Sequence, residues 1–244
     1  MHRILLQIGP VTLYSYGLLV ATAFLVSTIL ILRDSRKFDI AREDVFDCLL
    51  AVLIGGIVGG RLLFVILNRE YYLDHPLRIV MLQEGGMAFH GALVAAILVG
   101  AAVCAIKKVS FWKMSDLMTP YIALGHAIGR IGCLLNGCCY GKVIHSGLGL
   151  TFPGEAVMRV PTQFYSSLCL LFIFVALMEF RERRPFDGSV LALYLVLYGV
   201  FRFFMDFFRG DNPAVYHGLT LAQIISVFMV LLGFVLYALL RKKS

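Results

Sequence analysis

Charged residues are scarce in this chain: they make up 15% of its 244 residues, against about 25% in soluble domains. Apolar residues make up 60%, and the mean hydropathy is +0.86. A surface so poor in charge would not stay dissolved in water, which argues against a cytosolic enzyme, a nucleic-acid-binding module and a disordered chain. We therefore expect no nucleic-acid partner. The composition predicts one integral membrane domain over residues 1–244, surrounded by membrane lipid.

The chain also lacks internal repeats, low-complexity segments and any linker long enough to separate two domains. Repeated halves with broken helices at matched positions are typical of transporters, and neither is found. A membrane transporter of an anionic solute nevertheless stays an alternative, because inward-facing arginines also line such paths. Every lysine lies outside the long apolar runs, which excludes a seven-helix photoreceptor with a mid-span Schiff base.

Cysteine is limited to six residues, without the pattern of a disulfide framework. Three of them are scattered in apolar runs, where small thiols are ordinary core residues. Cys133, Cys138 and Cys139 have the spacing C-x₄-C-C, which lacks the second ligand pair of a zinc or cluster site. We therefore expect no metal. A disulfide between Cys133 and one of the other two is an alternative.

Long apolar runs are what the chain has in abundance. A helix that crosses a bilayer needs about 20 mostly apolar residues, and seven runs qualify: 11–32, 45–67, 87–106, 116–135, 163–180, 189–208 and 219–240. The predicted fold is therefore all-α, a polytopic membrane protein with seven transmembrane helices.

Lysine and arginine are unevenly divided between the two sets of loops. The segments after spans one, three, five and seven hold 13 of them, including the C-terminal Lys243, whereas the N-terminus and the remaining loops hold 6, including Arg3. Because cytoplasmic loops carry the excess of positive charge, this bias predicts an N-terminus outside and a C-terminus in the cytoplasm. The longer loops, 68–86 and 136–162, then lie on the outer side.

Three arginines fall inside predicted spans: Arg61, Arg130 and Arg202. A charged side chain at mid-span costs at least about 2.5–3.5 kcal/mol and usually faces a cavity or a partner. For Arg61, in Gly-Gly-Arg-Leu-Leu-Phe, a structural role and a functional one are equally open. Arg130 shares one helix face with His126 and Cys133, and this face would carry positive charge inside a glycine-rich, closely packed bundle.

The sixth span repeats this pattern. Tyr198, Arg202, Asp206 and Arg209 fall on one helix face, and an ion pair between Arg202 and Asp206 is the structural alternative. Such a pair leaves Arg130 and Arg209 in excess, which suits an anionic ligand. Arginine binds phosphate bidentately and keeps its charge at physiological pH, and a phospholipid headgroup is the anion most available there.

His90 lies at the start of the third span, next to glycines that favour close backbone approach to a ligand. A helix N-terminus attracts anions, and histidine transfers protons near neutral pH. A hydrogen-bonded core histidine is the alternative.

Several of these segments together resemble the prolipoprotein diacylglyceryl transferase family. The resemblance is carried by five motifs that occur in order along nearly the whole chain. They are Tyr16-Gly17, Gly85-Gly-Met-Ala-Phe-His90-Gly91, Gly129-Arg-Ile-Gly-Cys-Leu-Leu-Asn-Gly-Cys-Cys-Tyr-Gly141, Pro161-Thr-Gln-Phe-Tyr165 and Tyr198-Gly-Val-Phe-Arg202 with Phe207-Phe-Arg209. The family also has seven spans with the N-terminus outside.

The resemblance implies an enzyme of the bacterial cytoplasmic (inner) membrane that performs the first step of lipoprotein maturation. The diacylglyceryl group of phosphatidylglycerol would move to the thiol of the lipobox cysteine in a prolipoprotein signal peptide, forming a thioether and releasing glycerol phosphate. By match of position, the catalytic residues are His90, Arg130 and Arg202. The residues expected to bind substrate are Arg130, Arg202, Arg209, Tyr16, Tyr198, Gly86, Gly91, Asn136 and Gly141.

The chain departs from the family pattern at four positions. Cys133 and Cys138 stand where the family commonly has Asn and Glu, and Val160 and Ser166 where it has His and Glu. Because an amide and a carboxylate are thereby lost, a diverged phospholipid-using transferase with a different acceptor is an alternative.

The expected mechanism uses Arg130 and Arg202 to bind the lipid phosphate and stabilise the departing glycerol phosphate. The acceptor thiolate attacks the glycerol carbon bonded to that phosphate, with His90 as the base. No metal or organic cofactor is expected, because phosphate is already a serviceable leaving group.

Overall fold

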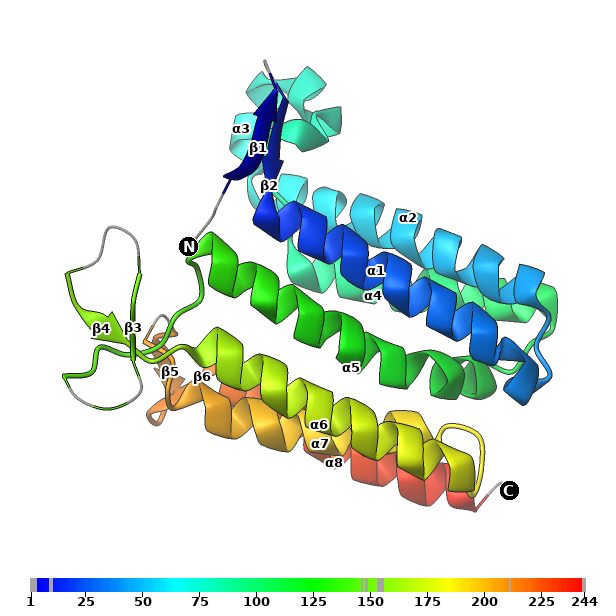
Figure 1. Cartoon of the computed structure of the whole chain (residues 1–244). Coiled ribbons are helices and arrows are strands. Elements are labelled where there is room, and N and C mark those ends of the chain that lie inside the picture. Colours follow the sequence, from blue (N-terminus) through cyan, green and yellow to red (C-terminus); the bar gives the residue numbers. More distant parts are fainter. Residues whose placement is uncertain are drawn as a thin grey trace. The chain divides into compact units, whose positions relative to one another are not determined.

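The computed structural model describes residues 4–8, 11–145, 147, 149–152, 156–210 and 212–242. Arg3 and Lys243, which contribute to the loop charge count, lie outside these residues. Helices dominate the described chain (Figure 1). They are α1 (Ser15–Asp34), α2 (Arg42–Leu67), α3 (Arg69–Asp74), α4 (Phe89–Lys107), α5 (Phe111–Asn136), α6 (Thr162–Arg183), α7 (Ser189–Asp206) and α8 (Leu221–Arg241), with short 3₁₀ turns η1 (Ser35–Phe38), η2 (Pro76–Val80) and η3 (Leu82–Glu84).

Among the described residues, six helical segments are long and apolar enough to span a membrane: Ser15–Phe38, Arg42–Leu67, Phe89–Lys107, Thr162–Arg183, Ser189–Asp206 and Leu221–Arg241. The chain is therefore a multi-pass membrane protein with an all-α membrane region. The run predicted at 116–135 is helical, as part of α5. It is not among the six because ionisable residues such as Asp116 and Arg130 make this helix less apolar.

In the described part of the chain, three short hairpins accompany the helices. Strand β1 (Ile4–Ile8) pairs antiparallel with β2 (Val11–Tyr14), β3 (Leu150–Thr151) with β4 (Met158–Arg159), and β5 (Ala214–Tyr216) with β6 (Leu219–Thr220). The first predicted span was therefore placed too early: residues 11–14 form a strand, and the helix begins at Ser15. Apolar content alone does not distinguish these β-prone residues from the first turn of a helix.

The described chain forms two compact units, residues 32–114 and residues 1–31 with 115–244. In the unit of residues 32–114, α2 and α4 are antiparallel, since Lys107 at the end of α4 pairs with Asp44 at the start of α2 (3.2 Å). Gly59 and Gly91 allow the two helices to approach closely. A Cβ at Gly91 would lie 2.4 Å from the carbonyl oxygen of Gly59, which is typical of small residues at membrane helix contacts.

In the unit of residues 1–31 and 115–244, α6, α7 and α8 run side by side (Figure 1). Asp116 of α5 is fully buried and accepts hydrogen bonds from the backbone N–H groups of Gly188, Val190 and Leu191. It therefore caps the N-terminus of α7 from another helix, where a carboxylate also interacts favourably with the helix dipole. Leu117, Ala123 and Ala127 are buried as well, so α5 packs against its neighbours along its length.

Candidate active site

One end of this second unit gathers the chain segments that carry the predicted arginines. Here α5 ends, α6 begins, α7 ends and α8 begins, close to the hairpins β3–β4 and β5–β6 (Figure 1). Side chains from the start of α6 hold the loop after α5: Gln163 donates to the carbonyl oxygen of Cys138 (2.6 Å) and Thr162 to that of Cys139 (2.9 Å). Both are buried, so the loop is fixed from its inner side.

Gly141 closes this loop against the end of α7. Its N–H donates to the carbonyl oxygen of Val160 (2.9 Å), and it forms a β-bridge with Arg209. A Cβ at this position would lie 2.5 Å from the carbonyl oxygen of Phe208 and 2.8 Å from the side chain of Thr162. Only glycine fits at this position. Gly141 therefore has a packing role, because its close backbone contacts position Arg209, and its predicted role in substrate binding stays a prediction.

Arg130 lies half-buried in the last two turns of α5. Within the part of the chain that the structure describes, no carboxylate forms an ion pair with it. Its charge acts on Arg202 and on His126, so guanidinium groups from α5 and α7 are close enough to repel each other. The fold thus places Arg130 and Arg202 in one neighbourhood, and their joint role in substrate binding stays a prediction.

Arg202 is the better compensated of the two arginines. Its Nη1 atom lies 3.1 Å from Oδ1 of Asp206, with 17% of the Arg202 side chain exposed and none of that of Asp206. Asp206 also accepts hydrogen bonds from Asn212 and Thr220. The ion pair considered as the structural alternative thus exists. It supplies one carboxylate charge in a neighbourhood that holds Arg130 and Arg209 as well.

Aromatic rings line the same region. The ring of Tyr198 lies 5.6 Å from that of His126 and 5.5 Å from that of Tyr194, measured between centroids. Tyr16, at the start of α1, is exposed and interacts electrostatically with Arg130 and Cys133. Both predicted tyrosines therefore belong to the neighbourhood of Arg130. Asn136 is the last residue of α5 and half-buried.

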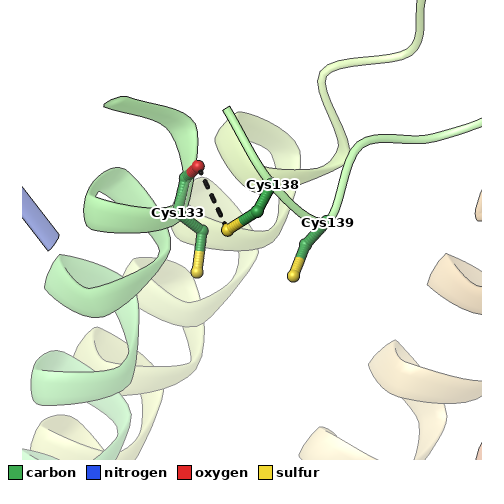
Figure 2. A group of neighbouring side chains, drawn as sticks. All are labelled: Cys133, Cys138 and Cys139. Carbon is green, nitrogen blue, oxygen red and sulfur yellow. Dashed lines mark hydrogen bonds between the residues drawn. The ribbon is translucent and has the colours of Figure 1, made fainter. Parts of the chain in front are cut away.

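Three thiols complete this end of the unit. Cys133 on α5 and Cys138 and Cys139 on the following loop have their sulfur atoms within 4.8 Å of one another (Figure 2). All three are half-buried and unbridged, and the Cys138 thiol donates to the carbonyl oxygen of Cys133 (3.7 Å). The hydrogen bond from Cys133, followed by the charges of Arg209 and Arg130, lowers the pKa of the Cys139 thiol below its usual range.

His90 belongs to the other unit, of residues 32–114. It is the second residue of α4 and its side chain is exposed, with the ring 5.7 Å from that of Phe89. It is not a core histidine. Gly86 and Gly91 flank it and have packing roles: the backbone of Gly86 has a φ of +82° close to the ring of Phe64, and Gly91 contacts Gly59.

Arg61 has a structural role. Its guanidinium is buried and donates to five backbone carbonyl oxygens. The acceptors lie in the segment that precedes His90: Arg78, Ile79, Met81, Gly85 and Gly86. Arg61 thereby supplies hydrogen-bond donors to carbonyl groups in and next to the turns η2 and η3. It also fixes the backbone that leads into α4.

Sequence reasoning did not single out Thr162, Gln163, Asn212 or Thr220, although each holds a part of this site. Thr162 and Gln163 stood inside one of the five motifs, which was the only available signal. The other two are ordinary loop residues, and nothing local in the sequence relates them to Asp206.

Comparison with known proteins identifies relatives along the whole chain. The family model described as prolipoprotein diacylglyceryl transferase matches residues 3–239. A protein of Desulfotalea psychrophila named phosphatidylglycerol–prolipoprotein diacylglyceryl transferase is 37% identical over 96% of this chain and 91% of its own length. Relatives with the same name in Geobacter sulfurreducens and Clostridioides difficile are 34% and 30% identical, over 98% and 100% of this chain and 95% and 97% of their own lengths.

Proposed function

The chain belongs to the prolipoprotein diacylglyceryl transferase family, and on that premise we propose how it carries out the transfer. It is a transferase of lipoprotein biosynthesis that moves the diacylglyceryl group of phosphatidylglycerol to a prolipoprotein. The acceptor is the thiol of the lipobox cysteine in the signal peptide, and the reaction takes place at the bacterial cytoplasmic membrane.

One observation carries the proposed lipid site. Arg130 acts on Arg202 electrostatically and has no ion-pair partner of its own among the described residues, whereas Asp206 pairs with Arg202. Bringing cationic groups together in a partly buried place is unfavourable unless an anion joins them. A lipid phosphate is such an anion, and it accepts the planar, bidentate hydrogen bonds of arginine.

The same contacts would stabilise the leaving group. The acceptor sulfur attacks the glycerol carbon that bears the phosphate, the carbon–oxygen bond breaks, and its electron pair leaves with glycerol phosphate. Negative charge then grows on the oxygen that Arg130 and Arg202 hold, which is where fixed cations accelerate a reaction most. Arg209, Asn136 and the rings of Tyr16 and Tyr198 are proposed to border the lipid headgroup.

His90 is the proposed base that takes the proton of the acceptor thiol. Its exposed imidazole at the start of α4 supports this role, because histidine is the side chain most often used for proton transfer. Gly86 and Gly91 are proposed to act through the backbone that positions His90.

We also propose α5 as the seventh span, with the N-terminus outside. Its 26 residues measure about 39 Å, enough to cross a bilayer. Its ionisable residues contact protein: Asp116 caps α7 and His126 packs on Tyr198. A helix covered by other helices does not need a strongly apolar surface. Reporter fusions after each span would test the topology, and a cytoplasmic N-terminus would refute it.

A transfer assay tests the function directly. Purified protein, phosphatidylglycerol vesicles and a lipobox peptide should yield a peptide heavier by one diacylglyceryl group in mass spectrometry. Arg130→Ala should reduce the rate by about 10²–10³-fold, the loss typical of one charge-stabilising donor. Arg183→Ala, which removes an exposed arginine paired with Glu179 at the far end of α6, is the matched control. Normal transfer by Arg130→Ala would refute the assignment.

A further inference from the structure

We propose that Cys133, Cys138 and Cys139 form a binding site for a divalent cation that prefers sulfur ligands, such as Zn²⁺. We further propose that the bound ion keeps one coordination position open for the acceptor thiol. The second part rests on the proposed function. Sequence spacing alone argued against a metal, because C-x₄-C-C offers no second ligand pair. The fold changes this by turning both loop thiols toward the thiol on α5 (Figure 2).

The distances suit one ion. All three sulfur atoms lie within 4.8 Å of one another. A tetrahedral zinc ion with bonds of about 2.3 Å to sulfur requires sulfur–sulfur separations of about 3.8 Å. Closing the remaining gap takes side-chain rotation and the loss of the weak hydrogen bond from the Cys138 thiol to the carbonyl oxygen of Cys133.

The backbone is already bent to make this possible. Side chains of adjacent residues in an extended segment point in opposite directions, which would separate the thiols of Cys138 and Cys139. Cys139 instead has a φ of +64°, after Gly137 at +71°. A left-handed conformation is uncommon for a residue other than glycine and is often found at ligand-binding positions. The side chains of Gln163 and Thr162 donate hydrogen bonds to the carbonyl oxygens of Cys138 and Cys139 and so hold this turn in place.

The charges fit as well. Three thiolates around a divalent cation carry a net charge of −1, and such a complex is stabilised by nearby cations. Arg130 and Arg209 act on Cys139 electrostatically. Thiolate ligands select soft cations such as Zn²⁺ over Mg²⁺ or Ca²⁺. These two arginines would therefore stabilise the loaded site and keep it beside the proposed phosphate position.

Three protein ligands leave zinc a fourth position, as in catalytic zinc sites. The reaction proposed above alkylates a thiol, and a thiol that coordinates zinc is deprotonated. An ion held by the three cysteines would coordinate the acceptor thiol and favour transfer of its proton to the proposed base. The sulfur then forms a bond with the glycerol carbon, the carbon–oxygen bond breaks, and glycerol phosphate leaves with the electron pair. The product thioether is a weaker ligand and dissociates.

The metal site is tested by titrating reduced, full-length protein in detergent with Co²⁺ and Zn²⁺. We expect about one ion per chain. The thiolate-to-cobalt charge-transfer band should have the intensity expected for three thiolate ligands. Cys133→Ser, Cys138→Ser and Cys139→Ser should each weaken binding by at least about a hundredfold, as expected for loss of one of three ligands. Cys169→Ser, which removes a half-buried thiol of α6, is the matched control.

Absence of binding, binding that survives all three substitutions, or a disulfide among these cysteines in protein purified without reductant would overturn the site. If a serine variant fails to fold, the wild-type spectrum with and without a chelator gives the same answer.

The open position is tested in the transfer assay. At neutral pH, loaded protein should transfer at least about tenfold faster than stripped protein, because coordination increases the thiolate fraction. Equal or slower transfer by loaded protein would overturn the role in thiol activation. If neither form transfers while the cobalt spectrum is present, the proposed function fails and the metal site stands.

Discussion

Asp206 offers the strictest test of the arrangement around Arg202. Its carboxylate is fully buried and serves Arg202, Asn212 and Thr220 at once. The substitution Asp206→Asn keeps the size and part of the hydrogen bonding but removes the negative charge. Arg202 would then lose the carboxylate that pairs with it, in a neighbourhood that also holds Arg130 and Arg209.

Removing one partner of a buried ion pair costs about 3–5 kcal/mol. The Arg202 side chain is 17% exposed, so water offsets part of this cost, and we expect the free energy of unfolding to fall by about 3 kcal/mol. For a chain of this size, each kcal/mol lowers the Tm by about 2–4 °C. The expected shift is therefore a decrease of about 6–12 °C.

Thermal unfolding in phosphatidylcholine nanodiscs measures this loss. Nanodiscs that contain phosphatidylglycerol should restore part of the stability, and more of it for the variant than for wild type, because an anionic headgroup replaces the missing charge. Asp47→Asn is the control. Asp47 pairs with Lys107 on the surface of α2 with a half-exposed side chain, and such surface ion pairs contribute little to stability.

Two results would refute this reasoning. A variant as stable as wild type in phosphatidylcholine would mean that Asp206 does not compensate the arginines. Equal stabilisation of variant and wild type by phosphatidylglycerol would mean that the lipid anion does not bind where the carboxylate charge acts.

Three further predictions concern residues that hold the rest of the fold. Arg61→Met should leave five carbonyl groups without their donor and increase hydrogen exchange over residues 76–86, while unchanged protection there would contradict the structural role of Arg61. Asp116→Ala should lower the free energy of unfolding by about 2 kcal/mol, the upper range for loss of an N-cap, whereas Asp187→Ala, at a weak and exposed ion pair, should change it little. Gly141→Ala should reduce diacylglyceryl transfer more than stability, because a Cβ 2.5 Å from the carbonyl oxygen of Phe208 displaces the backbone next to Arg209; full activity would show that this contact is not needed.

The sequence by itself determined the all-α membrane architecture and the presence of arginines inside it. Both are local properties. A run of apolar residues is long enough to cross a bilayer whatever its neighbours are, and an arginine within such a run is costly wherever it lies. The predicted runs at 45–67 and 163–180 agree with α2 and α6 to within a few residues. Two runs were placed too early at their start: β2 precedes α1 in the run at 11–32, and β6 precedes α8 in the run at 219–240.

The tertiary structure alone decided which groups surround each arginine. Arg61 and Arg130 look alike in sequence, both within glycine-containing apolar runs, yet Arg61 is surrounded by carbonyl groups from residues 78–86 whereas Arg130 stands beside Arg202. Likewise, C-x₄-C-C becomes a three-sulfur cluster only because of a left-handed turn at Cys139. Partners that lie far away along the chain are brought together by packing, and no local pattern of residue types encodes which of them will meet.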